Sequence, residues 1–312
     1  MRKKGFEMNF SWIFAILVGA VILFLAIYFA TRIVDTSGER IDAQTASKLA
    51  ILLDPLKTNI GETKIDKIIF ASNTRIYNDK CSMGGNFGEQ RIGIASYSFG
   101  NWKDPTYGKE QYNKYIFSQD VEESKEFYVF VKSFNLPFKV SEIIVLTGDE
   151  YCFINAPDSI KNDLDLGVSN FHFTNLKNNC SENSKKVCFS SSSGCDIAVY
   201  GEFGFERGYV NKEGERLDYI DDLIYAAIFS SPEVYNCNVK RLRMRLINLC
   251  SIYRDEIKIR ARAGCSSNLD AHLAEMINLA SSNANLVYLQ EKSDQIKTIN
   301  NGEECKLFEI EG

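Results

Sequence analysis

The chain has 312 residues, of which 45% are apolar and 25% charged, a composition typical of folded proteins and not of disordered or fibrous ones. Its formal net charge is −5, so the chain as a whole lacks the positive charge with which nucleic-acid-binding proteins neutralise phosphates. Proline is scarce and no internal repeat is apparent, so the length allows one large domain or two small ones.

The first predicted element is an apolar segment from Met8 to Thr31 that contains no charged residue. As a helix it would extend about 36 Å at about 1.5 Å per residue, enough to cross a hydrocarbon core of about 30 Å. A cleavable signal peptide has a shorter apolar region that ends in small residues. Here bulky residues such as Tyr28 and Phe29 continue the run. We therefore expect an uncleaved transmembrane helix over residues 8–33.

The flanking charges predict the orientation of this helix. Arg2, Lys3 and Lys4 precede it, whereas the charges that follow it nearly cancel. Positive residues favour the cytoplasmic side of a membrane. We therefore expect residues 1–7 to be a cytoplasmic basic tail and the rest of the chain to lie outside. No second apolar stretch of this length follows, so the sequence predicts a single-pass protein of the cell membrane.

Residues 34–60 are predicted to form a helical stalk with one apolar face. The apolar face could pack on the chain's own domain or on a neighbouring subunit. Its residues recur with helical spacing and are Ile41, Thr45, Leu49, Leu52, Leu53 and Leu56.

Residues 61–219 are predicted to form a β-rich extracytoplasmic domain. Its runs of β-branched and aromatic residues, such as KIDKIIFAS, EFYVFVKSF and FKVSEIIVL, are separated by Gly, Asn, Asp and Pro. One short helix is expected in PDSIKNDLDLG. We interpret the glycine-rich SMGGNFG beside Cys81 as a turn, because it lacks the GK[ST] ending of a phosphate-binding loop.

Residues 220–312 are predicted to form a helical subdomain packed beside the β-rich domain. In DYIDDLIYAAIFS the apolar residues fall on one helical face, with Asp218 as the expected N-terminal cap. The predicted fold class is therefore α+β, with an N-terminal transmembrane helix and stalk, a β-rich ectodomain core and a C-terminal helical subdomain.

A long helix is predicted to begin at the Ser231-Pro232 pair and to end at Gly264. Its basic residues could form a face for an anionic partner, or a solvated face paired with acidic residues elsewhere. They are Lys240, Arg241, Arg243, Arg245, Arg254, Lys258, Arg260 and Arg262. Two shorter helices are expected after it, in SSNLDAHLAEMINLA and over residues 284–299.

All the cysteines lie after the apolar segment, on the side where thiols tend to be oxidised. Cys250 falls in the apolar stripe of the long helix, so we expect it to be a buried free thiol. The expected disulfide-forming residues are Cys81, Cys152, Cys180, Cys188, Cys195, Cys237, Cys265 and Cys305. Cys188 and Cys195 could close a local loop. Cys237 and Cys265 cannot pair across about 42 Å of straight helix.

No catalytic, cofactor-binding or metal-binding motif is recognisable. The chain has no C-x2-C pair, no H-E-x-x-H and no G-x-S-x-G, and its two histidines, His172 and His272, lie in no nucleophile motif. The sequence therefore predicts no catalytic residue, no cofactor and no metal, and leaves enzymatic activity open. The tripeptide Asn179-Cys180-Ser181 is an acceptor pattern for N-glycosylation in a host that has that machinery.

The stretch KKGFEMNFSWIFAILVGAVILFL resembles the class III signal of type IV pilin-like proteins, in which a peptidase cuts just before the apolar segment. The resemblance implies a cut after Gly5. The chain departs from the pattern at the fifth mature position, where pilins usually carry a glutamate and this chain has Phe10, with its glutamate at Glu7. As a whole the chain resembles uncharacterised single-pass surface proteins of archaea, which implies a cell-envelope location.

The sequence supports three functional hypotheses. The first is a membrane-anchored, disulfide-stabilised extracytoplasmic protein with a structural or interaction role in the cell envelope. The second is a pilin-like subunit or assembly factor of a surface filament, and the third is an anchored enzyme or ligand-binding receptor. The expected partners are the lipid bilayer and other envelope or filament subunits. Nucleic acid is disfavoured by the external location.

Overall fold

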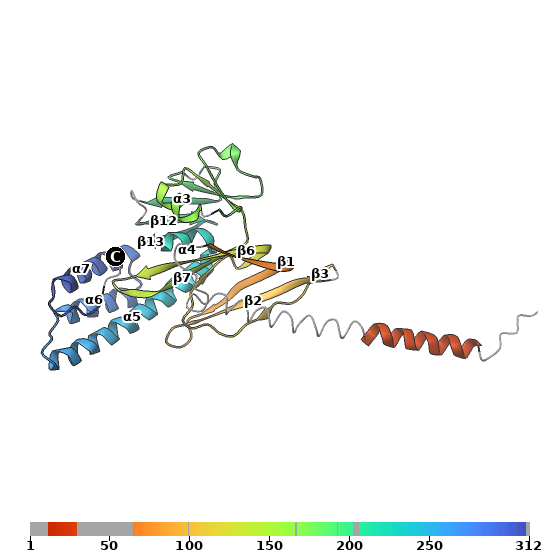
Figure 1. Ribbon diagram of the computed structural model, residues 1–312, viewed down its shortest axis with the longest axis horizontal. Coiled ribbons are helices and arrows are strands. Elements are labelled where there is room, and N and C mark those ends of the chain that lie inside the picture. The colour runs from red at the N-terminus through yellow and green to blue at the C-terminus, as the bar shows by residue number, and fades with distance from the viewer. Residues whose placement is uncertain are drawn as a thin grey trace, which may run out of the picture.

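The computed structural model describes residues 12–29, 65–98, 100–165, 167–191, 193–201 and 206–309. The predicted cytoplasmic tail and stalk lie outside these residues. The apolar segment is a helix over Trp12–Phe29, and none of it is buried against the rest of the protein (Figure 1). By its length and composition it is the one helix among the described residues that could cross a membrane.

The first of two sheets is mostly antiparallel and has the strand order β3-β2-β1-β6-β7-β5, with β4 paired to β2. Its strands are β1 (Ile65–Ser82), β2 (Glu89–Ser98), β3 (Asn101–Trp102), β4 (Thr106–Tyr107), β5 (Ile116–Phe117), β6 (Val121–Asn135) and β7 (Lys139–Thr147). The predicted SMGGNFG turn connects β1 to β2. Only β5 runs parallel to its neighbour, β7.

The second sheet has the order β13-β12-β11-β10-β8-β9. Its strands are β8 (Tyr151–Ile154), β9 (Phe171–Thr174), β10 (Lys185–Phe189), β11 (Ile197–Gly201), β12 (Arg207–Lys212) and β13 (Glu215–Ile220). Strands β9, β8, β10 and β11 are parallel, and the helix α3 (Asp158–Leu164) connects β8 to β9. The division of the β-rich region into two sheets is not visible in the runs of apolar residues.

Alternation along the strands gives the second sheet two different faces. Tyr151 and Phe153 of β8 face the main core, whereas Cys152 and Ile154 belong to a small separate cluster on the opposite face. Cys188 of β10 lies in the same small cluster. Two disulfides therefore cover a sheet face on which few apolar side chains are available.

The helical region contains α4 (Leu223–Phe229), α5 (Pro232–Arg262), α6 (Leu269–Ser281) and α7 (Leu286–Gly302). Ser231 caps α5 as predicted, because its hydroxyl accepts a hydrogen bond from the N–H of Val234. The prediction of Asp218 as a helix cap is wrong: this residue lies in β13. Glu213 and Gly214 have positive φ angles and form the tight turn that pairs β13 with β12.

Every residue of α4 is buried, because this short helix lies between the two sheets (Figure 1). Phe229, at its end, contacts the ring of Phe130 from the first sheet and those of Tyr151 and Phe171 from the second. One continuous hydrophobic cluster includes side chains from both sheets and from all four C-terminal helices. The helices therefore share one core with the sheets.

Candidate functional site

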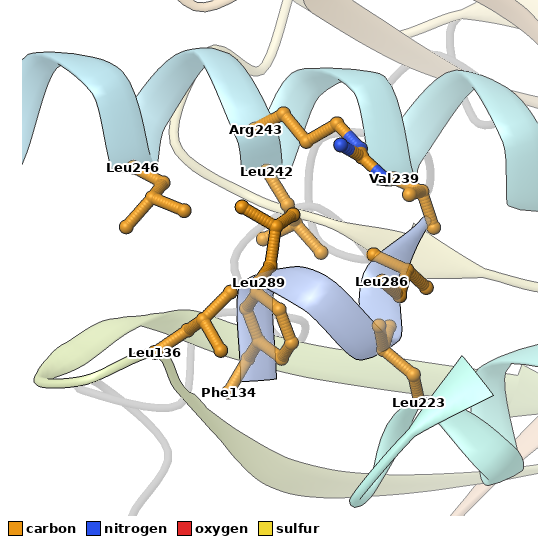
Figure 2. Close-up of a pocket in the computed structure, with 9 residues that line it drawn as sticks. All are labelled: Phe134, Leu136, Leu223, Val239, Leu242, Arg243, Leu246, Leu286 and Leu289. Atoms are coloured by element: carbon orange, nitrogen blue, oxygen red, sulfur yellow. The ribbon is translucent and has the colours of Figure 1, made fainter. Parts of the chain in front are cut away.

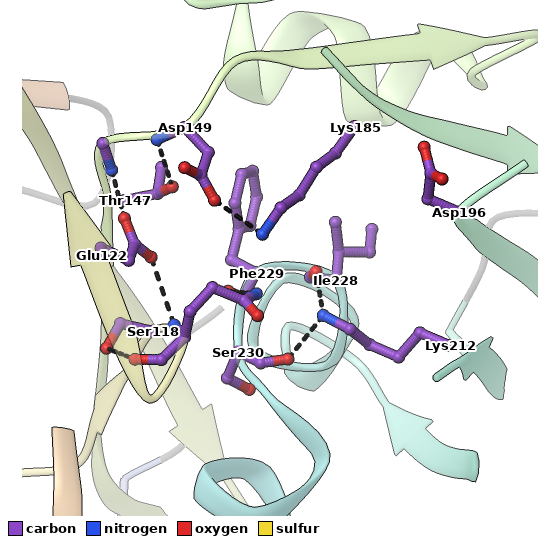
Figure 3. Close-up of polar contacts among 12 residues, drawn as sticks. Ser118, Glu122, Thr147, Asp149, Lys185, Asp196, Lys212, Ile228, Phe229 and Ser230 are labelled. Atoms are coloured by element: carbon purple, nitrogen blue, oxygen red, sulfur yellow. Dashed lines mark hydrogen bonds and ion pairs between the residues drawn. The ribbon is translucent and has the colours of Figure 1, made fainter. Parts of the chain in front are cut away.

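Four charged side chains lie around the place where α4 joins the two sheets, and we call them the junction cluster: Glu122, Asp149, Lys185 and Lys212 (Figure 3). Each comes from a different segment, namely β6, the turn between β7 and β8, β10 and β12. Glu122 and Lys212 are 1% and 4% exposed. Burial of ionisable groups is costly and often marks a functional site, so this cluster is the first candidate.

Glu122 is held by backbone donors at the end of the first sheet. Its carboxylate accepts hydrogen bonds from the N–H of Gln119, at 3.2 Å, and from the N–H of Gly148. Burial, reinforced by the negative charge of Asp149, nevertheless raises the pKa of the Glu122 carboxyl to about 8.

Lys212 binds the end of α4. Its ammonium group donates to the carbonyl oxygens of Ile228 and Ser230, at 3.0 and 2.6 Å (Figure 3). A cation is favoured at the C-terminal end of a helix, where carbonyl groups lack helical partners. Burial, with the nearby positive charge of Lys185, lowers the pKa of Lys212 to about 8.

Lys185 and Asp149 form the more exposed half of the cluster, with an N···O distance of 2.6 Å. The cluster thus places two buried groups, each with a pKa shifted to about 8 mainly by burial, near one ion pair. Three hollows lined by described residues stand out, and none of the four side chains lines them. The geometry fits a set of polar contacts that hold α4 to the sheets better than it fits a substrate-binding site.

The first hollow is a void of about 10 Å³ inside the core, between α4, α5, α7 and the end of β6 with the turn that follows it (Figure 2). Its lining is apolar apart from Arg243, and it has barely the volume of one water molecule. It is too small for an organic ligand.

The second hollow, of about 280 Å³, is polar and lies beside β9. It brings His172 together with one carboxylate, Glu150, and otherwise with serine, asparagine and tyrosine side chains. The other histidine, His272, lies on α6, where its Nδ1 is 2.9 Å from the ammonium group of Lys292. The third hollow, of about 390 Å³, lies beside the stacked rings of Tyr200 and Tyr209.

The basic residues of α5 do not form one face, because their positions point to different sides of the helix. Arg241 is fully buried. Arg243 and Arg245 donate to the carbonyl oxygens of Ala284 and Val140, both at 2.6 Å. Arg254 pairs with Asp270, Lys258 with Asp255 and Arg260 with Glu256, whereas Lys240 and Arg262 are exposed. No shared anionic-partner surface follows from this arrangement.

Arg241 instead organises a buried polar network between α5 and the first sheet. Its guanidinium donates to the carbonyl oxygens of Lys114, at 2.9 Å, and Gln111, at 2.8 Å, and to the side chain of Asn238, at 2.7 Å. It also lies 4.8 Å from the ring of Tyr115. The prediction of an exposed role for Arg241 missed this network, because its carbonyl partners carry no sequence signal.

The cysteines form four disulfides, Cys81–Cys237, Cys152–Cys180, Cys188–Cys195 and Cys265–Cys305. Cys250 is unpaired and buried. Cys81–Cys237 ties the β1–β2 hairpin to α5, and Cys265–Cys305 ties the loop after α5 to the end of α7. The other two disulfides lie within the second sheet and its loops, so each sheet and the helical region contain at least one disulfide-bonded cysteine.

Among the described residues, no group of three or more His, Cys, Asp or Glu side chains is placed to hold a metal ion. No protein-family model matches the sequence, no curated protein matches it, and no solved structure matches it.

The junction cluster itself could not be found from sequence spacing, since its four residues lie far apart in the chain. Of the four, only Lys212 has a sequence feature that points to burial. It lies two positions after Val210 in β12, so both side chains face the same side of the sheet, and both are buried.

Proposed function

We propose that this chain is a single-pass, membrane-anchored extracytoplasmic protein with a structural or interaction role in the cell envelope. One combination carries the proposal: an apolar helix of membrane-spanning length, with none of it buried, precedes a domain with four disulfides. A helix that is apolar on all sides and packs on nothing needs a nonpolar environment. Disulfides persist in oxidising compartments. Both features fit an anchor inside the membrane and a domain outside it.

The structural or interaction role rests on what the domain offers. Its buried Lys212 and Arg241 connect neighbouring elements of the fold through hydrogen bonds to carbonyl oxygens. Its four disulfides stabilise the domain against unfolding outside the cell. The lining of the polar hollow with His172 contains only one carboxylate, Glu150. We therefore favour a structural or interaction role over an enzyme or a ligand-binding receptor.

The test is the intact mass of the protein extracted from its own membranes, unfolded without reductant and treated with an alkylating reagent. We expect the mass of the full-length chain, plus that of any covalently attached group, with eight cysteines oxidised and one alkylated. A Cys250→Ala variant is the matched control, and it should show no alkylated thiol. Nine alkylated thiols would refute the external location, and a mass that lacks about 30 N-terminal residues would refute the anchor.

The same measurement separates the pilin-like alternative. Loss of Met1 to Gly5 would mean processing of the class III type and would favour a filament subunit or assembly factor. Protease treatment of intact cells checks the orientation independently. The domain that follows the apolar helix should be digested, whereas a cytoplasmic marker protein should survive.

A further inference from the structure

The loop between β9 and β10 presents the tripeptide Asn179-Cys180-Ser181 at the surface. This pattern, with any residue except proline in the middle, is the acceptor for N-linked glycans. We propose that Asn179 is glycosylated on the outer side of the membrane. The inference rests on the proposed extracytoplasmic location, and it adds a covalent sugar to that function.

The acceptor asparagine is exposed and weakly held. It is the last residue of a short 3₁₀ helix, Lys177–Asn179, and the chain becomes extended at Cys180. Its side-chain nitrogen makes one long contact, 3.4 Å from the hydroxyl oxygen of Thr174. Ser181 is exposed as well, so both residues that a glycosyltransferase must read are accessible.

The backbone of the loop is nevertheless well fixed. Cys180 is joined by a disulfide to Cys152 of β8, and the carbonyl oxygen of Ser181 accepts two hydrogen bonds from Ser184, at 2.8 and 3.2 Å. The acceptor amide therefore stands at a defined place on the protein and does not depend on local unfolding to be exposed.

The polar hollow of about 280 Å³ opens beside Asn179 and gives a sugar ring room and partners. Its lining offers hydroxyl, amide, imidazole and carboxylate groups, all of which hydrogen-bond to sugar hydroxyls. These residues are Glu150, Tyr151, Ser169, Asn170, His172, Asn179, Ser181 and Ser184. A glycan attached to Asn179 would therefore lie against side chains that can hydrogen-bond to it.

The modification needs a lipid-linked oligosaccharide as the donor. The side-chain nitrogen of Asn179 attacks the first carbon of the sugar, forming a C–N bond and losing one amide proton. The bond between that carbon and the phosphate oxygen of the polyprenyl carrier breaks, and the carrier phosphate leaves with the electron pair. No oxidant or reductant is involved.

A second copy of the pattern serves as an internal control. Asn9-Phe10-Ser11 has the same spacing but lies at the start of the apolar segment, next to the predicted cytoplasmic tail. The proposed orientation predicts that Asn9 stays unmodified while Asn179 is glycosylated.

The experiment is peptide mass spectrometry on the full chain purified from its own membranes. We expect the peptide that contains Asn179 to carry sugar mass, with fragmentation placing it on that residue. Asn179→Gln and Ser181→Ala should remove the modification, whereas Ser181→Thr, which keeps the acceptor pattern, should retain it. Asn178→Gln is the matched control, because it changes the neighbouring exposed residue and leaves the acceptor intact.

The intact mass of each variant, unreduced and alkylated, shows whether its disulfides have formed. An unmodified Asn179 in a protein with four disulfides would overturn this inference and leave the proposed function standing. Sugar that persists in both Asn179→Gln and Ser181→Ala would place the glycan elsewhere and overturn it too. Nine alkylated thiols would refute the external location and this inference with it.

Discussion

Cys81 and Cys237 are joined by a disulfide across 156 positions of the sequence, with their Cα atoms 6.3 Å apart. The bond connects the tip of the β1–β2 hairpin to the first turns of α5, beside the Arg241 network. The turn end of the β1–β2 hairpin is thus held to α5, the longest helix among the described residues, by one covalent bond and by the buried hydrogen bonds of Arg241.

Removing this disulfide should destabilise the protein more than removing a local one. Replacing both cysteines by alanine should cost about 2 to 5 kcal/mol. Cys188 and Cys195 are only seven positions apart. In the chain-entropy account, the loss of stability on removing their disulfide should be smaller than that for Cys81–Cys237, the difference being about 2 to 3 kcal/mol. Chemical denaturation of the two double variants measures the difference. Equal losses would mean that native contacts, and not loop length, set the contribution of each bond.

Arg241→Met should destabilise the protein by about 3 kcal/mol or more, because several buried carbonyl oxygens would lose their donor. The exposed neighbour provides the control: Lys240→Ala should change the free energy of unfolding by no more than about 0.5 kcal/mol. Urea denaturation of both variants is the measurement. Similar values for the two would show that the buried network contributes little.

The junction cluster predicts an unusual dependence of stability on pH. The pKa of Glu122 rises from 4.5 to about 8 on folding, so between these values the folded state holds more protons and stability falls as pH increases. The pKa of Lys212 falls from 10.5 to about 8, so above pH 8 the unfolded state holds more protons and stability recovers. These two groups together contribute a minimum near pH 8.

Glu122→Gln should remove the falling limb between pH 4.5 and 8, and Lys212→Met the rising limb above pH 8. We expect absolute stability to drop in both variants, since the glutamine amide would face a backbone N–H and the end of α4 would lose its cation. The readout is therefore the slope of unfolding free energy against pH, relative to the unmodified chain. Unchanged slopes would contradict the assigned pKa directions.

Cys250 should be unreactive in the folded protein. It is fully buried, and burial raises the pKa of its thiol to about 12, so almost no thiolate is present near neutral pH. We expect alkylation at pH 8 to be slower by at least about a hundredfold than in denaturant. A Cys250→Ala variant should take up no label in either condition. Rapid labelling of the native protein would mean that α5 opens readily.

Local patterns predicted the elements whose signal is contained in a few neighbouring residues. The apolar stripe of α5 correctly included Cys250, which is buried, and the Ser231-Pro232 pair marked where that helix begins. The same reasoning failed at Asp218. There a two-residue turn and pairing with β12 outweighed a run that also fits a helix.

The buried charges show why the rest was hidden. Arg241 looked like one of several exposed basic residues, because the carbonyl oxygens that receive it belong to a segment more than a hundred positions away. Glu122 and Lys212 carry no motif, and their pKa shifts arise from burial that only the packed sheets and α4 create.

The sequence by itself determined an apolar helix of membrane-spanning length, a mixed α+β composition and a set of cysteines suited to an oxidising compartment. Each of these follows from composition or from short-range periodicity along the chain. The tertiary structure alone decided which cysteines pair across long separations, that the strands divide into two sheets around α4, and which charges are buried. Those outcomes depend on contacts between distant segments, and the free energies of burial and hydrogen bonding that select them exist only once the chain is packed.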